Sequence, residues 1–250
     1  MTDQTLILVT GANRGLGYYA AQQMAATGGY HVLLGARSLS KAEDAIKELS
    51  SDSSVKLDTK YISPIEIDVT SDSSILQAVK TVEQKYGRLD VLLNNAGIAH
   101  AQSGKVEDGS LRKAYQAHYD TNVFGAAATT EAFLPLLRKG KNKRLAFTSS
   151  GLSSLKWASE MEGPASGENY PIYRSTKSAL DMIVVHYARS LEKEGFVVSS
   201  ADPGYCATNL NDFQGFKDPR EGAKVLIRVC EAGKEEVHCA RVDETSKEPW

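Results

Sequence analysis

Short apolar segments alternate with longer helical ones along nearly the whole chain, and this alternation restricts the fold more than any other feature of the sequence. Strands are expected at 5–9, 31–35, 89–94, 144–149, 196–201 and 236–240, and a further strand is expected to end in 65–69. Helices are expected at 15–26, 41–49, 71–86, 111–138, 173–194 and 220–231, with the fourth ending near Pro135. This order predicts an α/β fold with a doubly wound, mostly parallel sheet of about seven strands and helices on both faces.

Nothing in the sequence divides the chain into separate units. Its 250 residues allow one or two domains, but there is no Pro-rich linker, internal repeat or break in composition. We therefore expect residues 1–250 to form a single domain. One continuous sheet with its helices would use residues 5 to about 208. Too little chain is left for a separate substrate domain, so loops must recognise the substrate.

Charge and hydropathy exclude several kinds of partner. The 29 Lys and Arg residues nearly balance 31 Asp and Glu residues, and no basic cluster of the kind that binds nucleic acid is present. The densest basic stretch, 138–144, lies between a helix and a strand and fits a solvated helix end. No window reaches the roughly 18–20 apolar residues of a membrane span, and the chain does not begin with a signal-like segment.

The positions of the cysteines indicate a reducing cellular compartment, and those of the histidines argue against a metal site. Cys206, Cys230 and Cys239 form an odd set without C-x-x-C spacing, which suits free thiols in a reducing compartment such as the cytoplasm. The five histidines show no spacing typical of metal ligands, so we expect no metal.

A glycine-rich turn follows the first expected strand and opens the first helix. It reads T-G-x-x-x-G-x-G from Thr10 to Gly17. Glycines at such a turn let the backbone approach a pyrophosphate, while the helix N-terminus faces its charge. A glycine triplet alone could be only a tight turn, but its place between a strand and a helix favours nucleotide binding. The residues expected to contact the nucleotide here are Gly11, Asn13, Arg14, Gly15, Leu16 and Gly17.

Further motifs follow in a fixed order. They are Asn94-Asn95-Ala96-Gly97, Asn122, Ser149-Ser150, Tyr173-x-x-x-Lys177 and Pro203-Gly204. Together with the glycine turn they resemble the short-chain dehydrogenase/reductase family over nearly the whole chain, and the closing Glu248-Pro249-Trp250 looks like the end of its carbonyl-reductase-like members. The resemblance implies a Rossmann fold and an oxidoreductase that transfers hydride between a nicotinamide and a small-molecule carbonyl or alcohol substrate.

The resemblance also implies roles for four residues. Tyr173 would exchange a proton with the substrate oxygen, and Ser150 would donate a hydrogen bond to it. Lys177, one helical turn from Tyr173, would lower the tyrosine pKa and hold the nicotinamide ribose. Asn122 would support a water that links Lys177 to solvent. Ser150 is preferred to Ser149 because the family uses the second serine, and neighbouring side chains of a strand point to opposite sides.

Charge at the end of the second strand bears on the choice of cofactor. NAD-binding relatives carry an acidic side chain there, whereas this chain has Ala36 followed by Arg37. With Arg14 in the glycine turn, two guanidinium groups favour NADP(H), because guanidinium pairs well with phosphate. Arg37 could instead only cap a surface turn.

Other cofactor contacts follow from the resemblance alone. Asp68 would bind the adenine amino group, although a role as a strand-end turn former is equally open. The remaining implied contacts are Val69, Asn95, Ala96, Gly97, Pro203, Gly204 and Thr208, besides Tyr173 and Lys177. Gly97 could equally serve backbone geometry alone.

Two loops are expected to form the substrate site. Residues 152–170 lie in a segment about ten residues longer than in many family members, and they could cover the substrate pocket or form a solvent loop. Residues 205–219 carry Tyr205, Phe213 and Phe216, which suit an apolar ligand but could also pack the loop onto the domain.

Alternatives outside hydride transfer remain open. A non-redox use of the scaffold, as a biosynthetic catalyst or a nucleotide-sensing regulator, and a pure binding module are both weakened by the complete set of four catalytic-type residues. The helices at 111–138 and 173–194 could pair subunits of a homo-oligomer, unless the longer segment before Tyr173 obstructs that surface.

Overall fold

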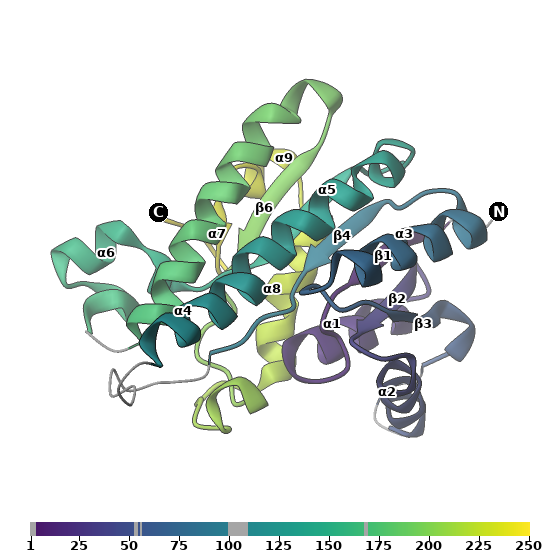
Figure 1. Cartoon of the computed structure of the whole chain (residues 1–250), viewed down its shortest axis with the longest axis horizontal. Coiled ribbons are helices and arrows are strands. Elements are labelled where there is room, and N and C mark those ends of the chain that lie inside the picture. The colour runs from purple at the N-terminus through teal and green to yellow at the C-terminus, as the bar shows by residue number, and fades with distance from the viewer. Residues whose placement is uncertain (1–3, 53–54, 56, 100–109, 168–169) are drawn as a thin grey trace.

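The computed structural model describes residues 4–52, 55, 57–99, 110–167 and 170–250 (Figure 1). Its strands are β1 (Thr5–Val9), β2 (Tyr30–Ala36), β3 (Ile62–Glu66), β4 (Val91–Asn94), β5 (Arg144–Thr148), β6 (Val197–Ala201), β7 (Arg241–Val242) and β8 (Lys247–Glu248). Its helices are α1 (Gly15–Ala26), α2 (Leu39–Ser51), α3 (Asp72–Tyr86), α4 (Leu111–Tyr119), α5 (Gly125–Arg138), α6 (Leu155–Glu160), α7 (Pro171–Ser190), α8 (Pro219–Glu231) and α9 (Lys234–Val237).

The strands form one sheet in the order β3-β2-β1-β4-β5-β6-β7-β8. All pairs are parallel except β7 with β8, which is antiparallel. The predicted doubly wound, mostly parallel sheet is therefore confirmed, with eight strands instead of about seven. Strand order reverses between β1 and β4, and in such sheets the crevice at the carboxyl ends beside this point is where ligands bind.

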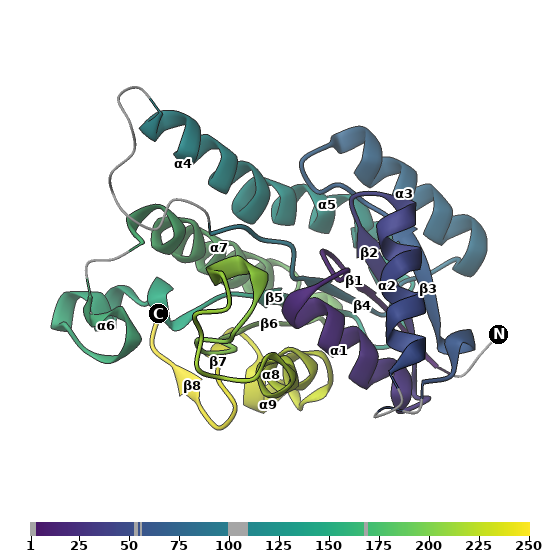
Figure 2. The same ribbon diagram turned by 90° about the horizontal axis from the view of Figure 1, so that it is seen from below.

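Two hydrophobic cores lie on opposite faces of the sheet. Alternation along β1 sends Ile7 and Val9 to the core beneath α1 and α8, and Leu6 and Leu8 to the core beneath α3, α5 and α7. Figure 2 shows these two helical layers on either side of the strands. No helix among the described residues is both long and apolar enough to cross a bilayer.

Most elements differ from their predicted bounds by a few residues, and the larger differences have physical causes. β3 begins at Ile62 and includes Pro64, which an edge strand tolerates because its missing N–H is not needed for pairing. The strand expected at 236–240 is wrong: α9 forms there, capped by a bond from the Gly233 N–H to the Glu236 carboxylate (3.1 Å), and β7 follows it.

The helix expected at 111–138 runs without interruption, but part of it is not α-helical. Asp120–Phe124 forms a π-helical turn between α4 and α5. The expected end near Pro135 is also wrong, because α5 runs on to Arg138 and buries Leu136 and Leu137 after the proline.

Candidate active site

The glycine turn joins β1 to α1 at the carboxyl edge of the sheet. Gly11 and Gly15 have φ angles of +63° and +62°, which glycine adopts most readily. At Gly17, a Cβ atom would lie 2.3 Å from the side-chain nitrogen of Asn95. Gly17 thus lets α1 pack closely against the segment after β4, while the bare backbone at Gly15, where a Cβ would meet only Thr208 at 3.8 Å, leaves the start of the helix open to a pyrophosphate.

The segment after β4 is bound directly to this turn. The Thr10 hydroxyl accepts hydrogen bonds from the N–H groups of Asn95 and Ala96, both at 3.0 Å. The Asn95 amide donates to the Thr10 carbonyl (2.9 Å) and its oxygen accepts from the Thr148 hydroxyl (3.2 Å). Asn95 and Ala96 therefore brace the turn, a structural role that the sequence reading did not assign to them.

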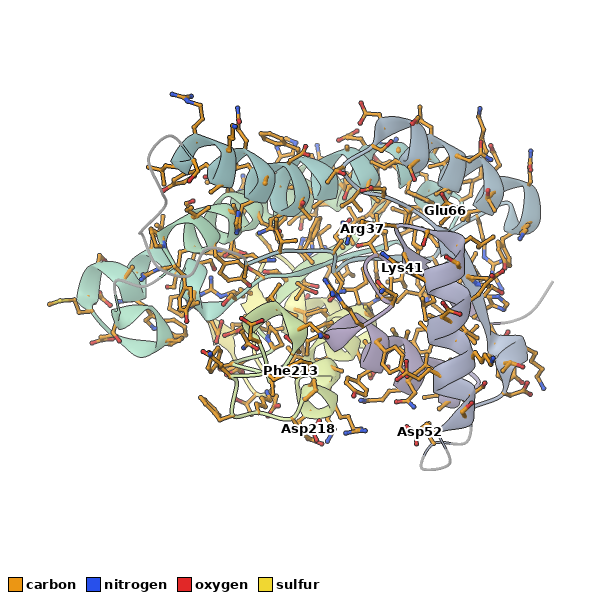
Figure 3. The ribbon with its side chains drawn as sticks, turned by 60° about the horizontal axis from the view of Figure 1, so that its bottom comes forward. Arg37, Lys41, Asp52, Glu66, Phe213 and Asp218 are labelled. Atoms are coloured by element: carbon orange, nitrogen blue, oxygen red, sulfur yellow. The ribbon has the colours of Figure 1, made fainter. Side chains whose placement is uncertain are left out.

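Three cations lie at the end of the crevice beside α2. Arg14, Arg37 and Lys41 are exposed, and no ion pair involves them within the described residues. Figure 3 shows Arg37 and Lys41 toward one end of α2, with Asp52 at its other end. This end of the crevice is thus positive and free to meet an anion.

One carboxylate, Glu66 at the end of β3, also lies near this region (Figure 3). It accepts a hydrogen bond from the Leu39 N–H (3.3 Å) at the start of α2. Its charge thereby complements the positive end of the helix dipole, where an acidic group is stabilising.

Asp68 follows β3 and serves as a turn former in the structure. Its Oδ1 atom accepts bonds from the Thr70 N–H (3.0 Å) and the Thr70 hydroxyl (2.8 Å). The neighbouring Val69 is buried against Gly125 of α5, where a Cβ would lie 2.7 Å from the Val69 carbonyl oxygen. These bonds account for Asp68 without a ligand, so its adenine contact stays a prediction.

Ser150, Tyr173 and Lys177 come together where β5 and α7 meet. α7 has Pro171 at its first turn, which places Tyr173 at the start of the helix, where the nearby Ser150 hydroxyl acts to lower the pKa of its phenol. The Lys177 ammonium lies 5.6 Å from the centre of the Tyr173 ring and donates to the Thr148 carbonyl (2.7 Å). The proton donor, the hydroxyl and the cation thus form one cluster.

Burial dominates the acid–base behaviour of this cluster. It raises the pKa of Tyr173, helped by the Asp202 carboxylate and opposed by the nearby Ser150 hydroxyl. The sequence led us to expect a lowered value, but burial outweighs the groups that would lower it. Burial also lowers the Lys177 pKa to about 8, against the carboxylate of Asp181. Tyr173 therefore stays protonated at neutral pH, the form that can donate a proton.

The two serines after β5 point to different surroundings. Ser149 is buried and donates to Asp181 (2.7 Å), whereas Ser150 contacts Tyr173. Strand alternation therefore brings Ser150, as expected, to the side of the crevice that carries the tyrosine.

Asn122 lies in the π-helical turn, a local geometry often found at functional sites. Its Oδ1 accepts from the Ile98 N–H (2.8 Å), and its Nδ2 donates to the Ile98 carbonyl (2.9 Å) and the Thr176 hydroxyl (3.0 Å). At Gly97, a Cβ would lie 3.4 Å from Asn122 Oδ1 and 3.7 Å from Lys177 Nζ. Its side chain thus fastens the segment after β4 beside Lys177.

The segment after β6 closes the crevice from the other side. Gly204 has a φ angle of +75°, and Thr208 lies 3.8 Å from the Cβ position of Gly15 in the glycine turn. The Thr208 hydroxyl accepts from the Leu210 N–H (3.3 Å). Cys206 between them is buried, which raises its thiol pKa to about 11 and disfavours a nucleophilic role.

The segment before Tyr173 is ordered as α6 and two short turns rather than a plain loop, with residues 168 and 169 outside the described part. Burial and the nearby Tyr170 phenol raise the pKa of Tyr205, so the two expected substrate loops lie near each other. A cavity of about 230 Å³ separates α6 from α7. Its lining on the α7 side includes Arg174, Ser175 and Ser178 but not Lys177. The part of the 152–170 segment at this cavity therefore covers a face of α7 other than the one that carries Lys177.

A buried charged network behind Ser150 was missed by the sequence reading. It joins Asp181 of α7, Asp202 after β6, and Arg241 and Glu248 of the last two strands. These residues are far apart in sequence, and only the position of Asp202 just before Pro203-Gly204 could have drawn attention to one of them.

Comparison with known proteins identifies the family. Residues 5–217 match the family model for short chain dehydrogenases. Short-chain dehydrogenase anuI of Penicillium roqueforti is 44% identical over 91% of this chain and 89% of its own length. Short-chain dehydrogenase/reductase tropE of Talaromyces stipitatus is 36% identical over 94% and 89%.

Solved structures share the fold at lower identity. NADPH-bound carbonyl reductase from chicken fatty liver has a TM-score of 0.80 at 23% identity, covering 100% of both chains. The 3-ketoacyl-(acyl-carrier-protein) reductase of Brucella melitensis, complexed with NADH, has a TM-score of 0.77 at 20% identity over 96% of both chains. With the family model and the fungal relatives, these findings show that the chain belongs to the short-chain dehydrogenase/reductase family of oxidoreductases.

Proposed function

We propose that the protein is an NADP(H)-dependent oxidoreductase that transfers hydride between the nicotinamide and a carbonyl or alcohol substrate. The observation that carries this proposal is the cluster of Ser150, Tyr173 and Lys177 beside the glycine turn. When bound, the nicotinamide would supply or accept the hydride. The residues of the chain would orient the substrate, move its proton and stabilise charge on its oxygen.

Each residue of the cluster has a distinct part in the proposal. In reduction, the Tyr173 hydroxyl donates its proton to the carbonyl oxygen, and Ser150 donates a hydrogen bond to the same oxygen as negative charge develops. Lys177 would hold the cofactor ribose, and Asn122 keeps the wall beside Lys177 in place through Ile98. Burial of Tyr173 keeps its proton available until a substrate accepts it.

The preference for NADP(H) rests on charge in this chain. Arg14, Arg37 and Lys41 would bind a 2′-phosphate, and Ala36 leaves no carboxylate on β2 to oppose it. Structural neighbours carry NADPH in one case and NADH in another, so likeness of fold does not decide between the two cofactors. The three free cysteines agree with a reducing compartment such as the cytoplasm.

The substrate is proposed to be apolar, with an aromatic or flat hydrophobic part. Phe213 and Phe216 are 61% and 90% exposed, and Tyr205 stacks edge-on with Phe216 at 5.9 Å. Phe213 also has a φ angle of +60°, a backbone conformation that costs energy for a residue other than glycine. Exposed aromatic side chains in one loop are typical of a binding surface.

A Phe213→Ala, Phe216→Ala double variant should raise the KM for a bicyclic aromatic ketone at least fivefold, because each of the two lost ring contacts is worth roughly 0.5–1.5 kcal/mol. The KM for a short aliphatic aldehyde should change less than twofold. Steady-state kinetics with both substrates measures the difference. Leu76→Ala, which removes an exposed apolar side chain of α3, is the matched control; equal effects on both substrates would remove the two phenylalanines from substrate recognition.

The proposed function is tested by screening aldehydes, ketones and quinones for substrate-dependent oxidation of NADPH. We expect turnover with at least one apolar carbonyl compound and a slower rate with NADH at equal concentration. NADPH binding without turnover across the whole screen would favour the non-redox alternative instead.

A further inference from the structure

A buried carboxylate, Asp181, lies on the helix that also carries Tyr173 and Lys177. Along α7, Asp181 follows Lys177 by one turn and Tyr173 by two, so the three side chains project from the same side of the helix. Asp181 is only 5% exposed. A charge held this far from water must be served by hydrogen-bond donors and a cation, and those partners show what Asp181 holds in place.

Asp181 is bonded to residues on both sides of Ser150 in the sequence. The Ser149 hydroxyl donates to Asp181 Oδ1 (2.7 Å), and the Ser153 hydroxyl donates to Oδ2. The Ser153 hydroxyl also lies 2.6 Å from the Ser150 carbonyl oxygen, which accepts from the Ser153 N–H as well (2.9 Å). One carboxylate of α7 therefore holds the chain immediately before and after the serine expected to contact the substrate oxygen.

A second bond from α7 fastens the same turn. The Ser178 hydroxyl donates to the Ser153 carbonyl (2.8 Å). Within the turn, the Ser150 hydroxyl oxygen accepts from the Leu152 N–H (3.2 Å), so its own proton is available to a substrate oxygen. The position of Ser150 relative to Tyr173 is thus set by bonds that come from the helix of Tyr173 itself.

Arg241 of β7 compensates the charge of Asp181 from the other side. It is fully buried and donates from Nη1 to Asp181 (2.9 Å) and to the Ser153 hydroxyl (2.5 Å), and from Nε to Glu248 (2.8 Å). Burial raises the pKa of Asp181, whereas the serine hydroxyls and Arg241 act to lower it. The guanidinium stabilises the buried carboxylate, which would be costly without a partner.

We propose that Asp181, with Arg241 as its partner, is a positioning residue that keeps the Ser150 hydroxyl where it and the Tyr173 hydroxyl can reach the same substrate oxygen. This inference rests on the proposed function, in which both hydroxyls act on that oxygen. It gives the β7–β8 hairpin a part in the reaction, because β7 supplies the cation. Moving a reacting group by about 1 Å can cost about 10²-fold in rate.

A double-mutant cycle with Ser150→Ala tests whether Asp181 acts through Ser150. Asp181→Asn keeps the shape of the side chain but replaces an accepting oxygen with an amide NH₂ group. It should lower kcat about 10- to 30-fold in the otherwise wild-type enzyme. In Ser150→Ala, which by itself should cost about 10²–10³ in kcat, the added loss should be less than about threefold, because no hydroxyl is left to misplace.

Both rates are expressed per NADPH-binding site, so that a smaller folded fraction does not count as a loss of kcat. The Kd for NADPH should change less than about threefold. If Asp181→Asn does not fold, Ser153→Ala takes its place in the cycle, since it removes one hydroxyl bonded to Asp181 and keeps the ion pair with Arg241. Its loss of kcat should likewise shrink in the Ser150→Ala background.

Asp90→Asn is the matched control, because Asp90 is also buried and paired with an arginine but precedes β4, at the opposite edge of the sheet. Its carboxylate accepts from Arg88 Nε (3.1 Å) and from the N–H groups of Leu6 (2.8 Å) and Lys141 (2.7 Å). Asp90→Asn should lower the temperature of thermal unfolding but leave kcat per binding site unchanged in both backgrounds.

Hydrogen exchange of residues 149–155 reports the turn without any turnover. The Ser153 and Ser154 N–H groups are bonded to the carbonyls of Ser150 (2.9 Å) and Gly151 (3.2 Å). Their exchange should be about tenfold faster in Asp181→Asn than in Asp90→Asn at matched stability, because only the first variant loosens this turn.

These measurements separate failure of the inference from failure of the proposed function. An equal loss of kcat from Asp181→Asn in both backgrounds would overturn the action of Asp181 through Ser150, even in an active reductase. Equal exchange of residues 149–155 in the two aspartate variants would overturn it independently. If the wild type reduces no carbonyl compound, the proposed function fails, and exchange alone decides whether Asp181 fixes the turn.

Discussion

Replacing Tyr173 with Phe should lower kcat by about 10³-fold or more and leave the Kd for NADPH within about threefold of wild type. General acid catalysis contributes about 10²–10⁴ in rate, and the phenyl ring keeps the packing of the tyrosine while losing only its hydroxyl. The lost hydroxyl is the one whose pKa the nearby Ser150, just after β5, acts to lower. Steady-state kinetics with an accepted carbonyl substrate measures kcat, and fluorescence titration measures NADPH binding.

Tyr187→Phe is the matched control, because it makes the same change in the same helix. The Tyr187 hydroxyl bonds to Glu131 (2.7 Å) on α5, and its loss should reduce stability by about 1 kcal/mol without changing kcat. Retention of more than a tenth of wild-type kcat by Tyr173→Phe would show that another group supplies the proton.

Cofactor choice should depend on the two arginines at the ribose end of the crevice. Replacing either Arg14 or Arg37 with Gln should raise the Kd for NADPH about tenfold, and replacing both should raise it by about 50- to 100-fold. Each step corresponds to about 1.4 kcal/mol, the low end of the range for a hydrogen bond to a charged group, because both side chains are exposed to solvent. The Kd for NADH should not change, since it has no phosphate at this position.

Arg189→Gln controls for loss of net positive charge, because Arg189 is exposed near the far end of α7. Binding measured at low and moderate salt adds a second check, since a contact between an exposed arginine and phosphate weakens as salt rises. Equal losses of NADH and NADPH affinity in the double variant would mean that the arginines support the turn itself, and the NADP(H) assignment would be wrong.

Local features of the sequence predicted most of the fold and named residues that the structure brings together at the candidate site. β1 and α1 begin and end at the predicted residues, because an apolar run, a glycine turn and a helical repeat are each encoded within a few positions. The approach of Ser150 to Tyr173 also followed from motif order, since parallel strands bring their carboxyl ends to one edge of the sheet.

Features that depend on distant contacts could not be predicted. The charge of Arg241 is compensated by Asp181 and Glu248, one of which lies 60 residues away, and nothing in the local pattern distinguishes it from a surface arginine. The raised pKa of Tyr173 has the same origin, because burial depends on the complete fold and not on the spacing of tyrosine and lysine. The order of α6 likewise depends on distant backbone, since the Lys156 N–H donates to the Trp250 carbonyl (3.0 Å).

The π-helical turn at Asp120–Phe124 takes up one more residue than a turn of ordinary helix does. Each residue of an α-helix turns the chain by about 100°, but the wider π turn spreads its extra residue over nearly the same total angle, so α4 and α5 keep nearly the rotational phase of one uninterrupted helix. The extra residue lies beside the active-site wall, where Asn122 reaches Ile98, while α5 keeps its buried face on the sheet. The wall can therefore carry this additional residue without disturbing the hydrophobic core.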